Sequence, residues 1–179
     1  MTEEHDHGIP RYSLWLLPDE SWSARLRREI EKLATIFVTP VFEAHVTVHG
    51  DLPLEREELA GRLPDLAAGL PPFSWRVQSV ETSPWRFRSL YLRLAPLPEF
   101  DRLEARSREC FGRSEGLPPF PHLSLAYGEP AEGSPKRPLA ARLSAEYSGL
   151  DIGFSRLALA RSSSSLPMEE WKILEQISL

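Results

Sequence analysis

Apolar and polar residues alternate in several short runs of this chain, and residues 121–128 show the pattern most informatively. Leu123 and Leu125 alternate with His122 and Ser124, and the run ends at a glycine. Alternation with a period of two is typical of a half-buried β-strand, in which side chains two residues apart share a face. We therefore expect the imidazole and the hydroxyl to lie side by side while the leucines enter the core.

The run 44–50 repeats this pattern. His45 and Thr47 share one face of the expected strand, and Val46 and Val48 share the other. A single His-x-Ser or His-x-Thr is common by chance, and its ordinary interpretation is a structural histidine. Two strands that each carry a hydroxyl at the same offset from a histidine favour a shared catalytic site.

Other periodic runs predict the remaining elements. Short apolar runs predict strands at 12–17, 73–80, 89–94, 153–160 and 171–177. Helical spacing predicts helices at 24–33, 55–70, 100–111 and 139–143. Ser21 or Ser23 is expected to cap the first helix, and the Gly-Arg-Leu-Pro stretch at 61–64 to interrupt the second. We interpret 162–165 as a hairpin loop without a site, and Cys110 as a core thiol.

The order strand, helix, loop, histidine strand occurs twice, once from Tyr12 to His45 and again from Tyr91 to His122. This suggests two copies of one strand–helix–strand unit. Two such units facing each other would bring the histidine strands together across a central groove. We expect residues 1–9 to form a flexible tail.

Composition narrows the functional classes. The chain has 179 residues, of which 41% are hydrophobic, and a formal net charge of -5. These values fit a single globular domain and disfavour binding of long nucleic acids, while a small nucleotide in a locally basic pocket remains compatible. No apolar run approaches the roughly 20 residues of a membrane span, and the first ten residues lack a signal-peptide core. With its single cysteine, the chain is expected to be a cytoplasmic monomer.

Two imidazoles with two hydroxyls suit phosphodiester hydrolysis. Water must lose a proton while the departing oxygen gains one, and a pKa near 6.5 lets one imidazole be neutral and the other protonated near neutral pH. Each hydroxyl can donate to a nonbridging phosphate oxygen. A cyclic phosphate is the natural substrate, because its small ring presents the phosphorus to water.

A zinc site is the less favoured interpretation. His45, Thr47 and His49 lie at ligand spacing, but threonine is a poor zinc ligand. His49 has no counterpart in the second histidine strand, where Ala126 holds the matching position. We therefore interpret His49 as peripheral and expect neither metal nor cofactor.

The motifs resemble those of a known family. His45-Val46-Thr47 and His122-Leu123-Ser124 look like the paired signature of the two-histidine (2H) phosphoesterase superfamily. The stretches 12–20, 121–127 and 154–159 are similar to the cyclic phosphodiesterase branch known from plants. This resemblance covers nearly the whole chain.

The resemblance implies a bilobal α+β fold, spanning 10–179 as one domain, with two pseudo-symmetric antiparallel β-sheet lobes and outer helices around the groove. It implies metal-free opening of a nucleoside 2',3'-cyclic phosphate to the 2'-phosphate, or of ADP-ribose 1'',2''-cyclic phosphate to the 1''-phosphate. His122 would activate water and His45 would protonate the leaving oxygen, although the symmetry allows the reverse. Thr47 and Ser124 would hold the phosphate.

Four further residues have two interpretations each. Tyr127 matches a family position near the phosphate, but strand parity places it with the core leucines unless the strand end turns it round. Trp85 either stacks on a base or packs in the core. Arg86 and Arg88 depart from the mostly uncharged segment expected in the plant-type enzymes, and either contact phosphate or face solvent. Trp15 is expected in the core.

Two other functions stay open. The first is a 2'-5' RNA ligase-like phosphoesterase acting on RNA ends, which the acidic charge balance disfavours. The second is a nucleotide-binding module without turnover, which the presence of both histidines and both hydroxyls disfavours. The sequence does not rank the two cyclic phosphates.

Overall fold

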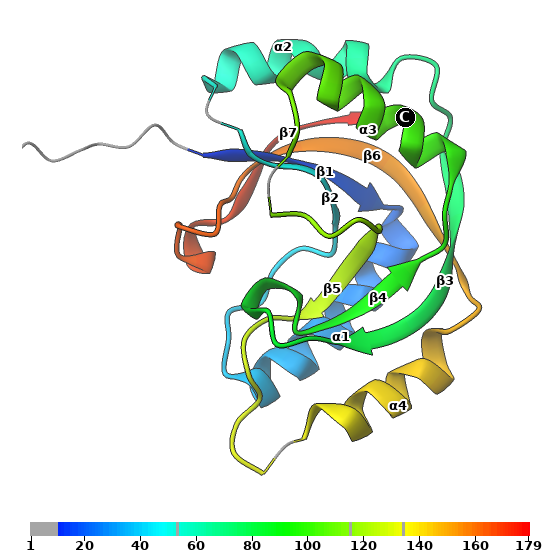
Figure 1. The fold of residues 1–179 in the computed structure, drawn as a ribbon, viewed down its shortest axis with the longest axis vertical. Helices are drawn as coiled ribbons and strands as arrows, with labels where there is room; N and C mark the ends of the chain where they lie inside the picture. The colour runs from blue at the N-terminus through cyan, green and yellow to red at the C-terminus, as the bar shows by residue number, and fades with distance from the viewer. Residues whose placement is uncertain (1–10, 53, 115, 134) are drawn as a thin grey trace, which may run out of the picture.

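The computed structural model describes residues 11–52, 54–114, 116–133 and 135–179 (Figure 1). The strands are β1 (Tyr12–Pro18), β2 (Val46–Leu52), β3 (Phe73–Thr82), β4 (Leu90–Leu94), β5 (His122–Ala126), β6 (Asp151–Arg161) and β7 (Lys172–Ser178). The α-helices are α1 (Glu20–Phe37), α2 (Arg56–Ala67), α3 (Pro98–Phe111) and α4 (Lys136–Tyr147). Two short 3₁₀ helices are η1 (Arg86–Arg88) and η2 (Met168–Glu170). The tail expected at 1–9 lies outside the described residues.

The strands form one antiparallel sheet in the order β1-β2-β5-β4-β3-β6-β7, and β6 also pairs with β1. The first part of β6 pairs with β3, and its later part lies between β1 and β7. Strands β1 to β6 therefore form a ring of paired strands, and β7 pairs with β6 outside this ring. The expected antiparallel α+β fold is confirmed.

The ring has an internal twofold relation. The succession β1-α1-β2-α2-β3 is followed by β4-α3-β5-α4-β6, and exchanging the two sets leaves the order of paired strands unchanged. The β2–β5 and β3–β6 pairs each join a strand to its equivalent in the other half, and the β3–β4 and β1–β6 pairs also link the halves. The predicted strand–helix–strand repeat is thus present, and it extends by one more helix and strand than the sequence pattern indicated.

The helices exchange partners between the halves (Figure 1). Helix α1, from the first half, packs against β5, and α4 packs against β3. Helix α3, from the second half, packs against β2, while α2 packs against β6 and β7. Each half therefore covers part of the other, so the two halves share one hydrophobic core.

The first helix is longer than predicted because its cap differs. The carboxylate of Asp19 accepts a hydrogen bond from the backbone N–H of Trp22 at 2.9 Å, so Asp19 is the N-cap. Two serines were expected to cap the helix. The hydroxyl of Ser21 donates instead to this same carboxylate, and that of Ser23 donates to the carbonyl of Pro18, the last residue of β1. The helix ends at Val38, which adopts a left-handed conformation with φ 52°.

Two other expectations fail. Helix α2 continues through 61–64, with Pro64 inside it, because buried leucines on both sides of the proline, including Leu59 and Leu66, hold it against the sheet. Cys110 is exposed, since the buried side of α3 stops at Ser107 and does not reach the last turn. Within the described residues, no helix combines the length and apolarity needed to cross a bilayer.

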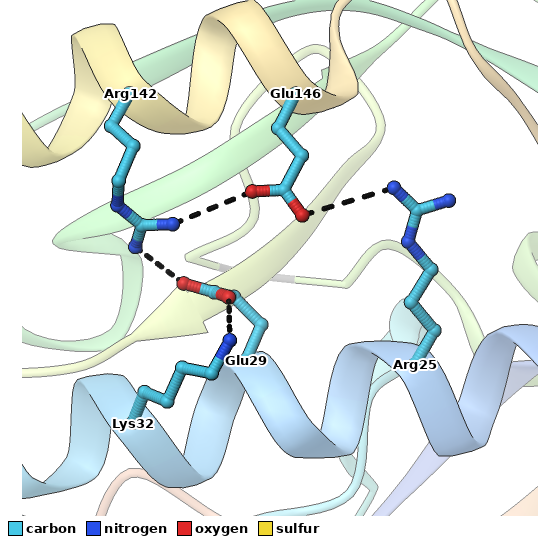
Figure 2. A network of polar contacts seen from close by, with 5 residues as sticks. All are labelled: Arg25, Glu29, Lys32, Arg142 and Glu146. Carbon is cyan, nitrogen blue, oxygen red and sulfur yellow. Dashed lines mark hydrogen bonds and ion pairs between the residues drawn. The ribbon is translucent and has the colours of Figure 1, made fainter.

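An ion-pair network joins α1 to α4 (Figure 2). The side chain of Glu29 is only 2% exposed, and its carboxylate lies 2.5 Å from Arg142 and 3.3 Å from Lys32. Glu146 lies 3.4 Å from Arg142 and 3.8 Å from Arg25. The carboxylate of Glu29 is thus buried between the two helices with two cations beside it.

Candidate active site

A pocket of about 650 Å³ opens where the two halves meet, and we call it the central pocket. Its lining comes from both halves: Ser13, Trp15, His45, Thr47, Gly50, Asp51, 85–88, 116–120, His122, Ser124, Tyr127, 162–164 and Trp171. All six residues that the sequence proposed for the site are among them. The bilobal arrangement therefore assembles them around one cavity.

The pairing of β2 with β5 explains how the two His-x-hydroxyl segments meet. Val46 is opposite Leu123 in this antiparallel pair, and both side chains are buried in the core. Side chains alternate between the faces of a strand. The residues before and after each member of the pair must therefore point to the other face, toward the central pocket.

This register places the four polar residues in a block. Because the strands are antiparallel, Thr47 comes beside His122 and His45 comes beside Ser124. The two histidines are therefore diagonal neighbours across this pair of strands. The Cα atoms of diagonal neighbours lie roughly 7–8 Å apart. That spacing leaves room for a small group between the two rings, and all four residues line the central pocket. His45 itself lies just before the first residue of β2.

His45 is held on two sides. Its Nδ1 donates a hydrogen bond to the carbonyl of Glu43 at 2.7 Å, which leaves Nε2 as its free ring nitrogen. The ring stacks on Trp15, with centroids 3.8 Å apart and planes 10° apart. Burial lowers the pKa of His45 to about 4; the Glu43 hydrogen bond opposes this shift, and the charge of His122 adds to it.

His122 is held in a matching way. The backbone of Phe120, again two residues upstream, favours the charged form of the His122 ring. Burial and the nearby Arg88 cation lower its pKa to about 4, although the backbone of Phe120 opposes them. Tyr91 contacts the ring edge-on, with centroids 5.6 Å apart. In the free protein both imidazoles are therefore neutral at neutral pH, instead of one neutral and one protonated.

Tyr127 both lines the central pocket and packs in the core. Strand β5 ends at Ala126, so the chain turns at Tyr127 and its side chain reaches the central pocket. The ring is also buried, stacked on Phe42 with centroids 4.2 Å apart. Burial raises the pKa of the phenol, and the nearby Ser124 hydroxyl opposes that shift. The hydroxyl therefore stays protonated and can donate.

Trp85 lies at the rim of the pocket. Its side chain is 68% exposed, which rules out core packing. Arg86 and Arg88 also line the central pocket, so neither simply faces bulk solvent. Trp15 is buried as expected, yet it also lines the pocket and stacks on His45, a contact that a strand pattern cannot reveal.

The sequence interpretation missed one wall of the pocket. Residues 162–164, interpreted as a loop without a site, line the central pocket. The hydroxyl of Ser13 donates to the carbonyl of Ser162 at 3.2 Å and ties this loop to β1. Asp51 also lines the pocket, at an irregularity in the β1–β2 pairing where its φ is 52°. Such bulges commonly turn a side chain toward a site.

His49 lies outside the central pocket, as its lack of a counterpart suggested. It lines a second pocket of about 430 Å³, and its Nδ1 lies 3.0 Å from the hydroxyl of Ser107 on α3. Across the described residues, no group of three or more histidine, cysteine, aspartate or glutamate side chains is placed to hold a metal ion.

An antiparallel α+β fold with two pseudo-symmetric His-x-hydroxyl segments across one pocket defines the class of two-histidine phosphoesterases. The chain belongs to the 2'-5' RNA ligase superfamily, whose model matches residues 18–165. It is 30% identical over 171 residues to the "Cyclic phosphodiesterase" of Arabidopsis thaliana, covering 94% of each chain. The resemblance seen in the sequence is thereby confirmed, and the protein is a phosphoesterase.

Two solved structures show the same fold. Escherichia coli LigT in complex with 3'-AMP has a TM-score of 0.59 at 19% identity, covering 95% of this chain and 98% of that chain. The protein TT0787 of Thermus thermophilus has a TM-score of 0.58 at 24% identity, covering 94% of this chain and 97% of that chain. At these identities the likeness concerns the fold alone.

Proposed function

We propose that this protein hydrolyses a cyclic phosphodiester on a small nucleotide by acid–base catalysis between His45 and His122, without a metal ion. The single observation that carries the proposal is the presence of both imidazoles and both hydroxyls, Thr47 and Ser124, in one pocket formed by the two halves. The plant relative named a cyclic phosphodiesterase supports the substrate class. Suitable substrates are nucleoside 2',3'-cyclic phosphates and ADP-ribose 1'',2''-cyclic phosphate.

The proposed step on a 2',3'-cyclic phosphate transfers one proton at each imidazole. A ring nitrogen of His122 takes a proton from water while the water oxygen bonds to phosphorus. The bond from phosphorus to the 3'-oxygen breaks, and Nε2–H of His45 protonates that oxygen. The product is the 2'-phosphate with a free 3'-hydroxyl. Thr47 and Ser124 donate to the nonbridging oxygens, where negative charge develops.

The two imidazoles are nearly equivalent electrostatically, so this assignment of roles rests on the resemblance to the family, and the symmetry of the site allows the reverse. Burial lowers the pKa of each to about 4; the Arg88 cation adds to the lowering at His122, and the charge of His122 adds to it at His45. A nearby cation disfavours a second positive charge, so one imidazole takes the catalytic proton while the other stays neutral.

Two aromatic residues complete the proposed site. The hydroxyl of Tyr127, beside Ser124, can donate to the phosphate. We propose that a nucleobase stacks on the exposed ring of Trp85 at the rim, a contact worth about 1–3 kcal/mol per base in nucleic-acid binders.

The test is turnover of 2',3'-cyclic AMP with excess chelator by the wild type, His45→Ala and His122→Ala. Each substitution should lower kcat at least about a hundredfold, since acid–base catalysis contributes about 10²–10⁴-fold. His49→Gln is the matched control, because this histidine lies outside the central pocket and should leave kcat nearly unchanged.

Other outcomes would redirect the proposal. Tenfold or smaller losses in both variants would remove the two-histidine mechanism, and loss of wild-type activity with chelator would remove metal independence. Turnover of a 2'-5'-linked dinucleotide in preference to 2',3'-cyclic AMP would favour action on RNA ends. Nucleotide binding without any product would identify a binding module.

A further inference from the structure

The central pocket contains a cation that has no acidic partner among the described residues. Arg88, at the end of η1, lies over the rings of Tyr91 and Phe120, at 5.6 and 5.3 Å from their centroids. Within the described part of the chain, its guanidinium forms no ion pair, and its buried Nε has no hydrogen-bond partner. Aromatic faces hold such a cation in place without neutralising it.

The neighbouring Arg93 shows what a neutralised arginine looks like here. Its guanidinium lies over the ring of Phe120, which Arg88 also contacts, at 4.3 Å from the centroid. Its guanidinium is 3.5 Å from the carboxylate of Glu81, and it does not line the central pocket. Two arginines thus contact one aromatic ring, and the one without a described carboxylate partner is the one in the pocket.

The position of Arg88 is fixed relative to the histidine strand. The preceding residue, Phe87, accepts a hydrogen bond from the hydroxyl of Ser124 at 3.3 Å through its carbonyl. The charge of Arg88 is also close enough to His122 to contribute to the lowering of that histidine's pKa, after burial. The guanidinium therefore shares the part of the pocket that holds the second His-x-hydroxyl segment.

We propose that Arg88 is the phosphate-binding cation of this site, contacting the nonbridging oxygens and stabilising the negative charge that they gain in the transition state. This inference rests on the proposed function. A planar guanidinium offers paired donors that match two phosphate oxygens. Charge stabilisation of this kind acts strongly in a pocket that excludes water. A bound phosphate would also supply the anionic partner that the described protein residues do not.

The first test compares Arg88→Met with Arg93→Met in the turnover of 2',3'-cyclic AMP. Methionine keeps an apolar contact with the aromatic rings and removes the charge. We expect Arg88→Met to lower kcat/KM about a hundredfold, as removal of one such donor does elsewhere. Arg93→Met removes an equal charge from the same ring outside the pocket, and kcat/KM should stay within about threefold.

The second test does not depend on turnover. Inorganic phosphate is titrated into each protein while the ring signals of His122 are followed by NMR. Arg88→Met should weaken phosphate binding at least about tenfold, because a charge-assisted hydrogen bond is lost. Arg93→Met should bind phosphate like the wild type. The pKa of His122 should also rise in Arg88→Met, since one cause of its lowering is gone.

The two proposals fail in different ways. If the wild type turns over substrate and Arg88→Met matches Arg93→Met in both rate and phosphate affinity, the role of Arg88 is overturned while the proposed function stands. If the wild type yields no product and phosphate binding still requires Arg88, the proposed function fails and the phosphate site remains.

Discussion

His45 and His122 are placed in equivalent surroundings by residues close to them in sequence. The backbone two residues upstream favours the charged form of each ring, and burial lowers the pKa of each to about 4. Acid–base catalysis needs one of them protonated. A bound phosphodiester is an anion, and an opposite charge nearby raises the pKa of an imidazole. In the proposed mechanism, the substrate itself therefore helps the site to acquire its catalytic proton.

At the residue scale this predicts the pH dependence of the reaction. The profile of kcat/KM reports the free enzyme, so its optimum should lie below pH 6.5, the unperturbed imidazole pKa. The profile of kcat reports the complex, so its optimum should lie at higher pH. Initial rates with 2',3'-cyclic AMP between pH 4 and 8 measure both. Coinciding optima above pH 6.5 would contradict the lowered pKa values.

Helices α1 and α4 come from different halves and are joined by the Glu29 network (Figure 2). A carboxylate that is 2% exposed depends on its partners, since burial of an unpaired charge is costly. Arg142 is about half exposed, which reduces the effect of removing it. Removal of Arg142 should thus lower the free energy of unfolding more than loss of a surface ion pair does, and less than loss of a fully buried one.

At the element scale we expect Arg142→Met to lower the free energy of unfolding by about 2 kcal/mol, because Glu29 then keeps only Lys32. Arg62→Met is the control, since the Arg62–Glu58 pair on α2 is about half exposed on both sides and 3.8 Å long. Its loss should be under about 0.5 kcal/mol. Urea unfolding at neutral pH measures both, and equal losses would contradict a special role for the network.

The two halves together bury the imidazoles of His45 and His122 in their neutral form, which couples the stability of the whole molecule to pH. The unfolded chain has imidazoles with pKa near 6.5, whereas folded His45 and His122 have pKa about 4. Between these values the unfolded state binds more protons. The stabilisation is therefore complete above pH 6.5 and is lost as the pH falls toward 4.

For the whole molecule this predicts a loss of about 1 kcal/mol in the free energy of unfolding per imidazole between pH 7 and pH 5.5. The His45→Gln, His122→Gln double variant should lose about 2 kcal/mol less over this interval than the wild type does. Urea unfolding at the two pH values measures the difference, and most carboxylates remain ionised throughout. Equal losses in the two proteins would mean that both imidazoles titrate normally in the folded state.

The local pattern of the sequence determined the strands and the facing of their side chains. The alternation around His45 and His122 identified both His-x-hydroxyl segments, because a period of two fixes which residues share a face. The ends of the first and last helices were predicted poorly, whereas the start of α2 and the end of α3 were predicted to within one residue. The cap at Asp19 and the passage of α2 through Pro64 depend on a competing side chain and on burial against the sheet, and spacing shows neither.

The tertiary structure alone decided what surrounds the histidines. Residues 162–164 reach the central pocket because β6 pairs with both β1 and β3, a closure between distant parts of the chain. Arg88 and Arg93 contact the same aromatic ring, but only Arg88 lines the central pocket and only Arg93 has a described carboxylate within reach, and both differences depend on folding. The sequence thus determined which groups could do chemistry, since residue identity and local period are written in the chain. Their partners, burial and protonation depend on contacts that exist only once the two halves have closed.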